Sequence, residues 1–558
     1  MTASLDRFAA RDELVFLPLG GSGEIGMNFN AYGFGPPDDR QWIIVDCGVL
    51  FGRETDAPGV DVLVPDVRYL AERRENILGI VATHAHEDHI GAIAHLWPVL
   101  RCPVYATPFT ARLIAGKLEE AGLSHVRVDE VPVGGKLTLG PFALDFISIT
   151  HSILEPNLLA IRTPLGVVAH TGDWKIDPDP LLGEETDAAA LEKLGDEGVL
   201  ALVCDSTNAL VPGASGSEAA VRESLTRLIG TLTGRVAVTG FASNIARLDS
   251  IAHAARAAGR RIALVGRSMQ KMVQAARDTG YLKDFPPVLD ETEAADLPPH
   301  KVLYLCTGSQ GEPRAALARI ADDSHPNVHL GEGDTVVFSS RVIPGNELAI
   351  FAVQNKLAAR GVSLLTAEDH FVHVSGHPCR DELTQMYRWI RPRLAVPVHG
   401  EMRHQVAHAR LARELQVPQA IVPENGQLFR LAPGRPELID EVPSGRVHLD
   451  GFVLVSEGEG LAKERRAMGY SGLLVISLVL DGKGRVAAAP SVLGEGMPEP
   501  VQDAVLRAVE ETIRQNGGGK KRRADPDELA ETVRRAARRA AAEAWGKKPP
   551  TRVLVTEL

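Results

Sequence analysis

The sequence is poor in cysteine and aromatic residues and has no long apolar run. Its 558 residues include five cysteines and 5% Phe, Trp and Tyr. Because the cysteines are scattered and form no C-x-x-C pair, a disulfide-stapled scaffold is excluded and reduced thiols are expected. No run of 18 apolar residues could cross a bilayer, and the first 14 residues lack the apolar stretch of a secretory signal. We therefore expect a cytoplasmic protein with no membrane segment.

Basic residues are outnumbered by acidic ones. The chain has 60 Lys and Arg against 72 Asp and Glu, a net charge of −12. Taken alone, this charge argues against a protein that coats nucleic acid, because phosphate affinity comes mainly from Lys and Arg. The length and the 44% hydrophobic content allow three to four domain-sized units with cores of their own.

The sequence shows two different patterns of predicted secondary structure. Before residue 208, short apolar runs such as 77–84 and 142–151 end at Gly, Pro or charged residues and indicate strands of a buried sheet. From about 210 to 365, helix and strand patterns alternate, which favours a mostly parallel sheet covered by helices. The predicted boundaries are 1–208 and 369–447 for the two parts of a sheet-rich domain, 209–368 for an inserted α/β domain, 448–465 for a linker and 466–558 for a C-terminal α+β domain.

Three histidines and an aspartate are clustered in the segment THAHEDH (83–89), between an apolar strand and a helix. Imidazole and carboxylate groups suit zinc, and a loop at a strand end can direct several ligands to one point. His84 and His86 share a face of an extended segment, and Asp88 and His89 follow where the helix begins. The spacing differs from the His-Glu-x-x-His pattern of metalloproteases. We therefore predict a metal site here.

Further candidate ligands stand at later strand ends. His151 follows FALDFISIT, Asp173 follows VVAHTG, and His399 follows LAVPV. Each residue alone is more typical of a structural polar group. Together with the first cluster, they become candidate metal ligands.

These segments resemble the metallo-β-lactamase fold with a two-metal site. The resemblance implies an αββα sandwich in which His84, His86 and His151 hold one ion, and Asp88, His89 and His399 hold the other. Asp173 would bridge the two ions. It implies two Zn²⁺ per chain, with Mn²⁺ or Mg²⁺ as substitutes, and a hydroxide activated by both metals.

Other segments resemble the β-CASP nucleases and, among them, the ribonuclease J family. They are LGGSGEIGMN (19–28), DSTNA (205–209), FASN (241–244), TGSQGEP (307–313), IPGNE (343–347), HVSGH (373–377) and PVHGE (397–401). The sequence departs from the family pattern at Ser152–Glu155, after His151, and at Ala246, where a histidine usually precedes Arg247.

The resemblance also implies residues that act on RNA. Ser375 and Gly376 would donate hydrogen bonds to a phosphate. His377, in preference to His373, would protonate the departing 3′ oxygen. Asp205 and Asp88 would join the catalytic set, and the list of further RNA contacts is Ser206, Ser243, Asn244 and His377.

Two other sequence patterns do not by themselves indicate a binding site. Gly21–Gly26 fits G-x-G-x-x-G with Asp46 twenty residues later, but Gly and Pro follow it where a helix should open, so a hairpin is expected. Basic residues near the C-terminus suit a solvated helix face, an RNA contact or a self-association surface. They are Lys520, Lys521, Arg522, Arg523, Arg534, Arg535, Arg538 and Arg539.

The family resemblance thus predicts a zinc-dependent ribonuclease for RNA maturation and decay. It would act as a 5′-to-3′ exonuclease favouring 5′-monophosphorylated RNA and as an endonuclease, in a homodimer or homotetramer. The alternatives are a small-molecule hydrolase of the same fold, such as a thioesterase or lactonase, and a catalytically silent RNA-binding subunit.

Overall fold

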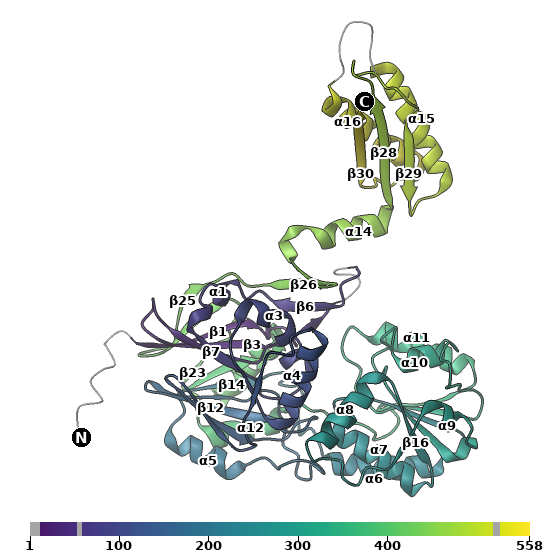
Figure 1. The fold of residues 1–558 in the computed structure, drawn as a ribbon. Helices are drawn as coiled ribbons and strands as arrows, with labels where there is room; N and C mark the ends of the chain where they lie inside the picture. Colours follow the sequence, from purple (N-terminus) through teal and green to yellow (C-terminus); the bar gives the residue numbers. More distant parts are fainter. Residues whose placement is uncertain (1–11, 53–57, 517–524) are drawn as a thin grey trace. The chain divides into compact units, whose positions relative to one another are not determined.

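The computed structural model describes residues 12–52, 58–516 and 525–558. The chain divides into two compact units, one within Met1–Leu50 and Val64–Gly445 and one within Phe51–Leu63 and Arg446–Leu558. Among the described residues, none of the helices combines the length and apolar character that a membrane span requires. The first unit contains both the sheet-rich part and the inserted α/β part (Figure 1).

Two sheets form the centre of the first unit. One contains β1 (Glu13–Gly20), β3 (Phe29–Gly35), β4 (Gln41–Val45), β7 (Ile77–Val81), β8 (Val104–Ala106), β9 (Val128–Glu130), β24 (Gln427–Ala432) and β25 (Glu437–Glu441), in the order β25-β24-β1-β3-β4-β7-β8-β9. The other contains β10 (Lys136–Leu139), β11 (Phe142–Ser148), β12 (Asn157–Thr163), β13 (Gly166–His170), β14 (Ala201–Asp205), β21 (Leu394–Val398) and β23 (Gln419–Ala420), paired in chain order.

The sheets pack face to face through one buried cluster. Phe16 and Tyr32 of the first sheet lie in it with Leu144, Phe146 and Val203 of the second. Leu144 and Phe146 are two apart in β11, so they point to the same face. Full burial of such side chains stabilises the fold by roughly 1.5–3 kcal/mol each.

Helices cover the outer faces of this pair of sheets. The outer face of the second sheet packs against α5 (Ala188–Glu197), α12 (Arg380–Ile390) and α13 (Met402–Glu414). On the first sheet, α4 (Pro108–Glu120) packs beside β8 and β9. These layers form the αββα sandwich that the resemblance implies.

The inserted part has its own parallel sheet. Its strands are β15 (Val236–Thr239), β16 (Arg261–Val265), β17 (Val288–Leu289), β18 (Val302–Cys306), β19 (Thr335–Phe338) and β20 (Ser363–Leu365), in the order β17-β16-β18-β15-β19-β20. Every pairing in this sheet is parallel, as the alternating pattern predicts. Helices α6 (Glu218–Thr231), α7 (Ile245–Ala257), α8 (Arg267–Asp278) and α11 (Glu347–Ala359) belong to the same part.

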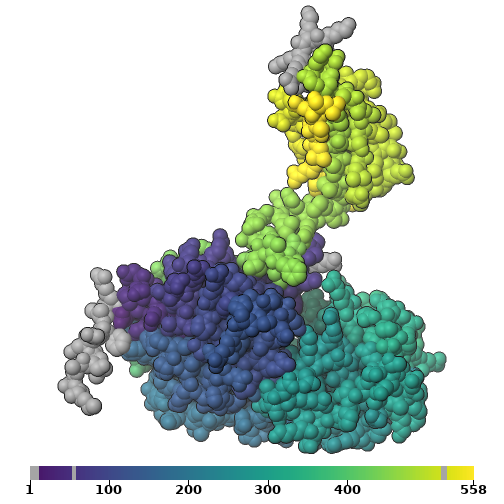
Figure 2. Space-filling view, in the orientation of Figure 1, coloured from purple at the N-terminus to yellow at the C-terminus, as the bar shows by residue number. Residues whose placement is uncertain are grey.

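The inserted part lies against the sandwich within the first unit. Figure 2 shows its teal surface directly beside the blue surface of the sandwich. Across this boundary α4 and α8 are joined by the ion pairs Arg112–Asp278, at 3.0 Å, and Lys271–Glu120.

The second unit contains a three-stranded sheet and two long helices. Its elements include β28 (Leu473–Leu480), β29 (Ser491–Glu495), α15 (Glu499–Asn516), α16 (Pro526–Trp545) and β30 (Thr551–Glu557), with strand order β29-β28-β30. Alternate residues of β28, such as Leu474 and Ile476, pack against Val505 of α15 and Val533 of α16. The expected linker, 448–465, overlaps β26 (Arg446–Asp450), β27 (Val453–Ser456) and α14 (Leu461–Ser471).

Candidate metal centre

Of the clustered histidines, His84 and His86 lie between β7 and α2 (Glu87–Ile90), and His89 lies within α2. His86 is the N-cap residue of α2 and has an extended backbone. Its Nδ1 atom is 3.1 Å from His84 Nε2 and 3.0 Å from Nε2 of His151, which follows β11. Three ring nitrogens from two segments therefore converge on one point.

Aspartate and histidine side chains continue this cluster on both sides. The structure brings together three sets in which all ligand atoms lie within 4.8 Å of one another: His84, His86, His151 and Asp173; Asp88, His89, Asp173 and His399; and Asp173, Asp205, His377 and His399. Asp173 belongs to all three sets. The first two sets are the two ligand groups that the family resemblance implies, each with Asp173, and the third was not predicted as a set.

The chemistry of these groups fits metal ions. Asp173 Oδ1 and His399 Nε2 are buried without a hydrogen-bond partner, which is costly unless another partner binds them. Burial lowers the pKa of His84 and His151 and lowers that of His86 to about 4. These imidazoles are therefore neutral near pH 7, the form that binds metal.

Asp46, at the end of β4, orients the histidine loop. Its carboxylate accepts hydrogen bonds from Thr83 N (2.7 Å) and Thr83 Oγ1 (2.9 Å), and it contacts His89 Nδ1 (2.7 Å). Sequence reasoning missed this role, because Asp46 stood out only as the acid of a false dinucleotide pattern. A residue that fixes a histidine in this way sets its tautomer and ring orientation.

Asn28, after the segment LGGSGEIGM, connects both sides of the centre. Its Nδ2 atom donates to the Asp88 backbone oxygen (3.1 Å) and lies 3.0 Å from His89 Nε2. Its Oδ1 atom is 2.9 Å from His399 Nδ1. The segment was noted for its family resemblance, but the contacts of Asn28 follow only from the fold.

Gly48 leaves no space for a side chain beside this loop. A Cβ there would lie 1.7 Å from the Asp88 backbone oxygen. We expect Gly48→Ala to displace Asp88 and weaken metal affinity about 10- to 100-fold, the range for loss of groups that support ligands. Competition with a chelator measures this affinity, and Gly230→Ala, where no atom lies within 4 Å, is the matched control. Unchanged affinity in Gly48→Ala would contradict this account.

Asp205 and His377 form a pair beside the candidate metal ligands. His377 Nδ1 lies 2.8 Å from Asp205 Oδ2 and 3.8 Å from Asp173 Oδ2. Burial lowers the pKa of His377, but the carboxylates of Asp205 and Asp173 outweigh it and raise this pKa to about 9. His377 is therefore positively charged near pH 7, and its side chain is 25% exposed.

His373 lies outside the three ligand sets and beside Arg247. Its Nδ1 atom is 3.5 Å from Arg247 Nη1. Burial, reinforced by the charge of Arg247, lowers the pKa of His373 to about 3, so this side chain is neutral at pH 7.

The other predicted RNA contacts have different surroundings. Ser375 Oγ accepts from Asn208 Nδ2 (2.8 Å) and from His377 N (3.1 Å), and the Gly376 carbonyl accepts from His151 Nδ1 (2.5 Å). Ser206 is fully buried, with its hydroxyl 2.9 Å from His408 Nδ1.

FASN ends at the start of α7. Asn244 is the N-cap of α7; its Oδ1 atom accepts from Arg247 N, and its Nδ2 atom donates to Glu218. Ser243 is half-buried.

Arg247 joins α6 and α7 to the segment before His373. Its guanidinium donates two bonds to Glu218, at 2.8 and 2.9 Å, and also donates to the backbone oxygens of Ser339 and Val372. The side chains of Arg247 and Glu218 are 2% and 3% exposed. Arg247 directly follows Ala246, the position where the sequence departs from the family pattern.

We expect Arg247→Ala to destabilise the inserted part by about 3–5 kcal/mol, because it leaves Glu218 buried without its ionic partner. Hydrogen exchange of α6 and α7 amides measures this loss. Arg222→Ala is the matched control, since Arg222 pairs with Asp249 across the same two helices at 22% and 24% exposure. It should cost at most about 1 kcal/mol. Equal losses in the two variants would contradict the prediction.

Comparison with family models covers most of the chain. Residues 30–229 match the metallo-beta-lactamase superfamily, and residues 233–357 match the ribonuclease J beta-CASP domain. Residues 366–423 match the Zn-dependent metallo-hydrolase RNA specificity domain, and 460–558 match the ribonuclease J C-terminal domain. The predicted fold class is confirmed.

Several curated proteins are similar along nearly their whole length. Ribonuclease J of Sinorhizobium meliloti is 48% identical, over 99% of this chain and 98% of the relative. Ribonuclease J of Thermus thermophilus is 39% identical, over 90% of each chain. A solved protein of unknown function from Enterococcus faecalis shares the fold at a TM-score of 0.52 and 15% identity, over 75% of this chain and all of that chain.

Proposed function

Because the chain belongs to the ribonuclease J family, we propose that it is a metal-dependent ribonuclease that removes nucleotides from the 5′ end of RNA and also cleaves internally. The main observation behind the proposal is that Asp173 is shared by all three ligand sets and that the Asp205–His377 pair lies next to it. Matches to β-CASP and RNA-specificity domains do not favour a small-molecule hydrolase.

The proposed ligands are the residues expected from the sequence. His84, His86 and His151 would hold one ion, Asp88, His89 and His399 a second, and Asp173 both. Zn²⁺, Mn²⁺ or Mg²⁺ at these positions would supply positive charge beside the scissile phosphate and make a water molecule more acidic. The neutral state of His84, His86 and His151 supports this assignment.

The residues of the chain would hold and protonate the RNA. Asp205 fixes Nδ1 of His377, which leaves Nε2 to give its proton to the departing 3′ oxygen. The products would be a 5′-phosphate and a 3′-hydroxyl. The Ser375 hydroxyl accepts two bonds and keeps its own proton to donate to a phosphate. Gly376 and Ser243 complete the proposed RNA contacts. Ser206 and Asn244 are buried with their side chains hydrogen-bonded within the protein, so the contacts expected for them are not proposed.

One assay tests the function. The purified protein is analysed for metal and given end-labelled RNA with a 5′-monophosphate or a 5′-triphosphate. We expect bound metal, cleavage that a chelator abolishes and added Zn²⁺ or Mn²⁺ restores, and faster decay of the monophosphorylated RNA. Metal-free protein that cleaves RNA at full rate would overturn the proposal. Sedimentation of the same sample tests the proposed homodimer or homotetramer.

A further inference from the structure

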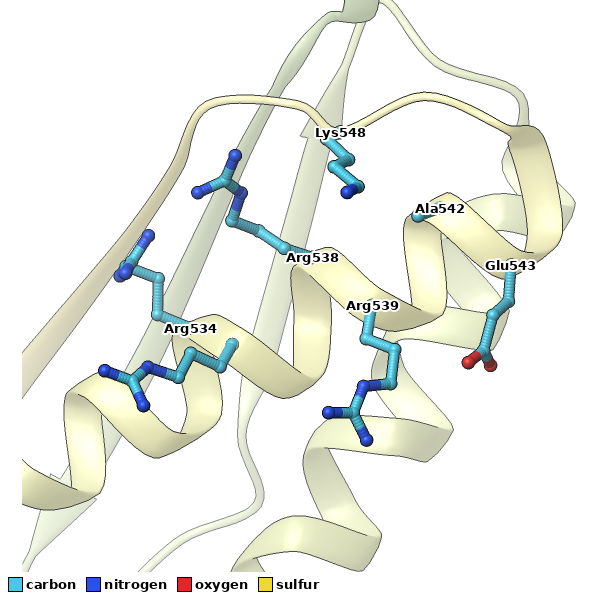
Figure 3. Close-up of a pocket in the computed structure, with 7 residues that line it drawn as sticks. Arg534, Arg538, Arg539, Ala542, Glu543 and Lys548 are labelled. Atoms are coloured by element: carbon cyan, nitrogen blue, oxygen red, sulfur yellow. The ribbon is translucent and has the colours of Figure 1, made fainter.

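A cluster of positive charge lies on α16 in the second unit. Four arginines occupy positions 534, 535, 538 and 539, whereas Leu529, Val533, Ala537 and Ala541 face the core. Side chains four apart share a helix face, so the arginines form two adjacent pairs one turn apart. Figure 3 shows Arg534, Arg538 and Arg539 extending from α16 and Lys548 from the loop that follows it.

These side chains line a hollow of about 490 Å³, here called the basic hollow. Its lining consists of Arg534, Arg535, Arg538, Arg539, Ala542, Glu543 and Lys548. Five cations thus face a single carboxylate in a chain whose net charge is −12. The basic residues Lys520–Arg523 lie outside the described residues.

The charges of the hollow are only partly balanced. Glu531 binds Arg534, at 2.6 and 2.7 Å, and Arg535, at 2.7 Å. Among the described residues, no ion pair is found for Arg538, Arg539 or Lys548. Arg538 Nε is moreover buried without a hydrogen-bond partner. Unpaired guanidinium N–H groups are uncommon in folded proteins, and water or another bound acceptor usually satisfies them.

We propose that the basic hollow binds the phosphates of an RNA strand at a second site, separate from the metal centre. This inference rests on the proposed function, which makes RNA the partner. Guanidinium groups bind phosphate through paired N–H donors. Arginines four apart lie about 6 Å apart along the helix, so neighbouring phosphates of one strand can each meet an arginine. The other occupant to be tested is an acidic surface of a second copy of the chain.

The experiment measures binding of the full chain to a 40-nucleotide RNA in the presence of a chelator, which prevents cleavage. The variant Arg538→Ala/Arg539→Ala/Lys548→Ala removes the cations that have no ion pair among the described residues, and alanine keeps helix propensity high. The matched control is Lys483→Ala/Arg507→Ala/Arg552→Ala, which removes the same charge from exposed positions of the same unit. We expect RNA affinity to fall at least about 10-fold in the first variant only. The slope of log affinity against log salt should fall by about 2, at about 0.7 per lost phosphate contact.

The outcomes separate this site from the ribonuclease function. Affinity equal to wild type in the hollow variant, or equal losses in both variants, overturns the basic hollow even when the protein cleaves RNA with metal. A selective loss supports the hollow even when no cleavage is found. Dissociation of an oligomer with unchanged RNA affinity assigns the surface to a second copy and overturns the proposal. If assembly and affinity both change, crosslinks from 4-thiouridine RNA decide: crosslinks within 526–548 support the site, and crosslinks only elsewhere overturn it.

Discussion

Asp173→Asn should lower the rate of RNA cleavage by about 1,000-fold or more. Metal ions contribute several kcal/mol to stabilising such transition states, and each 1.4 kcal/mol is a factor of ten in rate. Asp173 belongs to all three ligand sets, so no other single carboxylate of the centre contacts as many ligands. Its Oδ2 atom lies 3.2 Å from His89 Nε2 and 3.3 Å from His399 Nε2.

The measurement combines single-turnover cleavage with metal analysis of the same sample. We expect the variant to retain its secondary structure and to lose bound metal, since asparagine has the shape of aspartate without its charge. Asp145→Asn is the control, because Asp145 pairs with Arg162 at 2.7 Å outside the centre. An Asp173→Asn protein with full metal content and wild-type cleavage would refute the metal assignment.

His377→Asn and Asp205→Asn should each slow cleavage by about 100- to 10,000-fold, the usual contribution of a positioned general acid. The double variant should be little slower than either single one, because the two side chains act as a pair. His373→Asn should cost less, since His373 is held neutral beside Arg247.

Metal analysis distinguishes the two roles open to His377. Lost cleavage with unchanged metal content supports proton transfer by His377, whereas lost metal indicates that His377 acts as a ligand. Additive effects of His377→Asn and Asp205→Asn would contradict the paired role.

The candidate metal ligands could be predicted because most of them follow the ends of strands. His84, His86, Asp88 and His89 are neighbours in the sequence, and strands that end at one edge of a sandwich bring His151 and Asp173 to the same place. The family resemblance supplied the division of these residues between two metal ions. The ribonuclease J resemblance is confirmed by the family models and by full-length relatives.

The supporting residues were not predictable in this way. Asp46 and Asn28 are ordinary polar residues in sequence, and their importance comes from contacts with His89, His399 and the Asp88 backbone. The partner of His377 is 172 positions away, at Asp205. A side chain is excluded at position 48 only because the backbone of Asp88 passes beside Gly48.

The pairing of β1 with β24 also has a consequence for biosynthesis. Leu14 pairs with Ala432, 418 residues later, so one edge of β1 stays open until that residue leaves the ribosome. At a synthesis rate of about 5–20 residues per second, roughly 20–80 s pass between the synthesis of β1 and that of β24. The inserted part, built from neighbouring helix–strand units, is complete in sequence before then. An exposed strand edge favours aggregation, so the nascent chain should depend on chaperones chiefly during this interval.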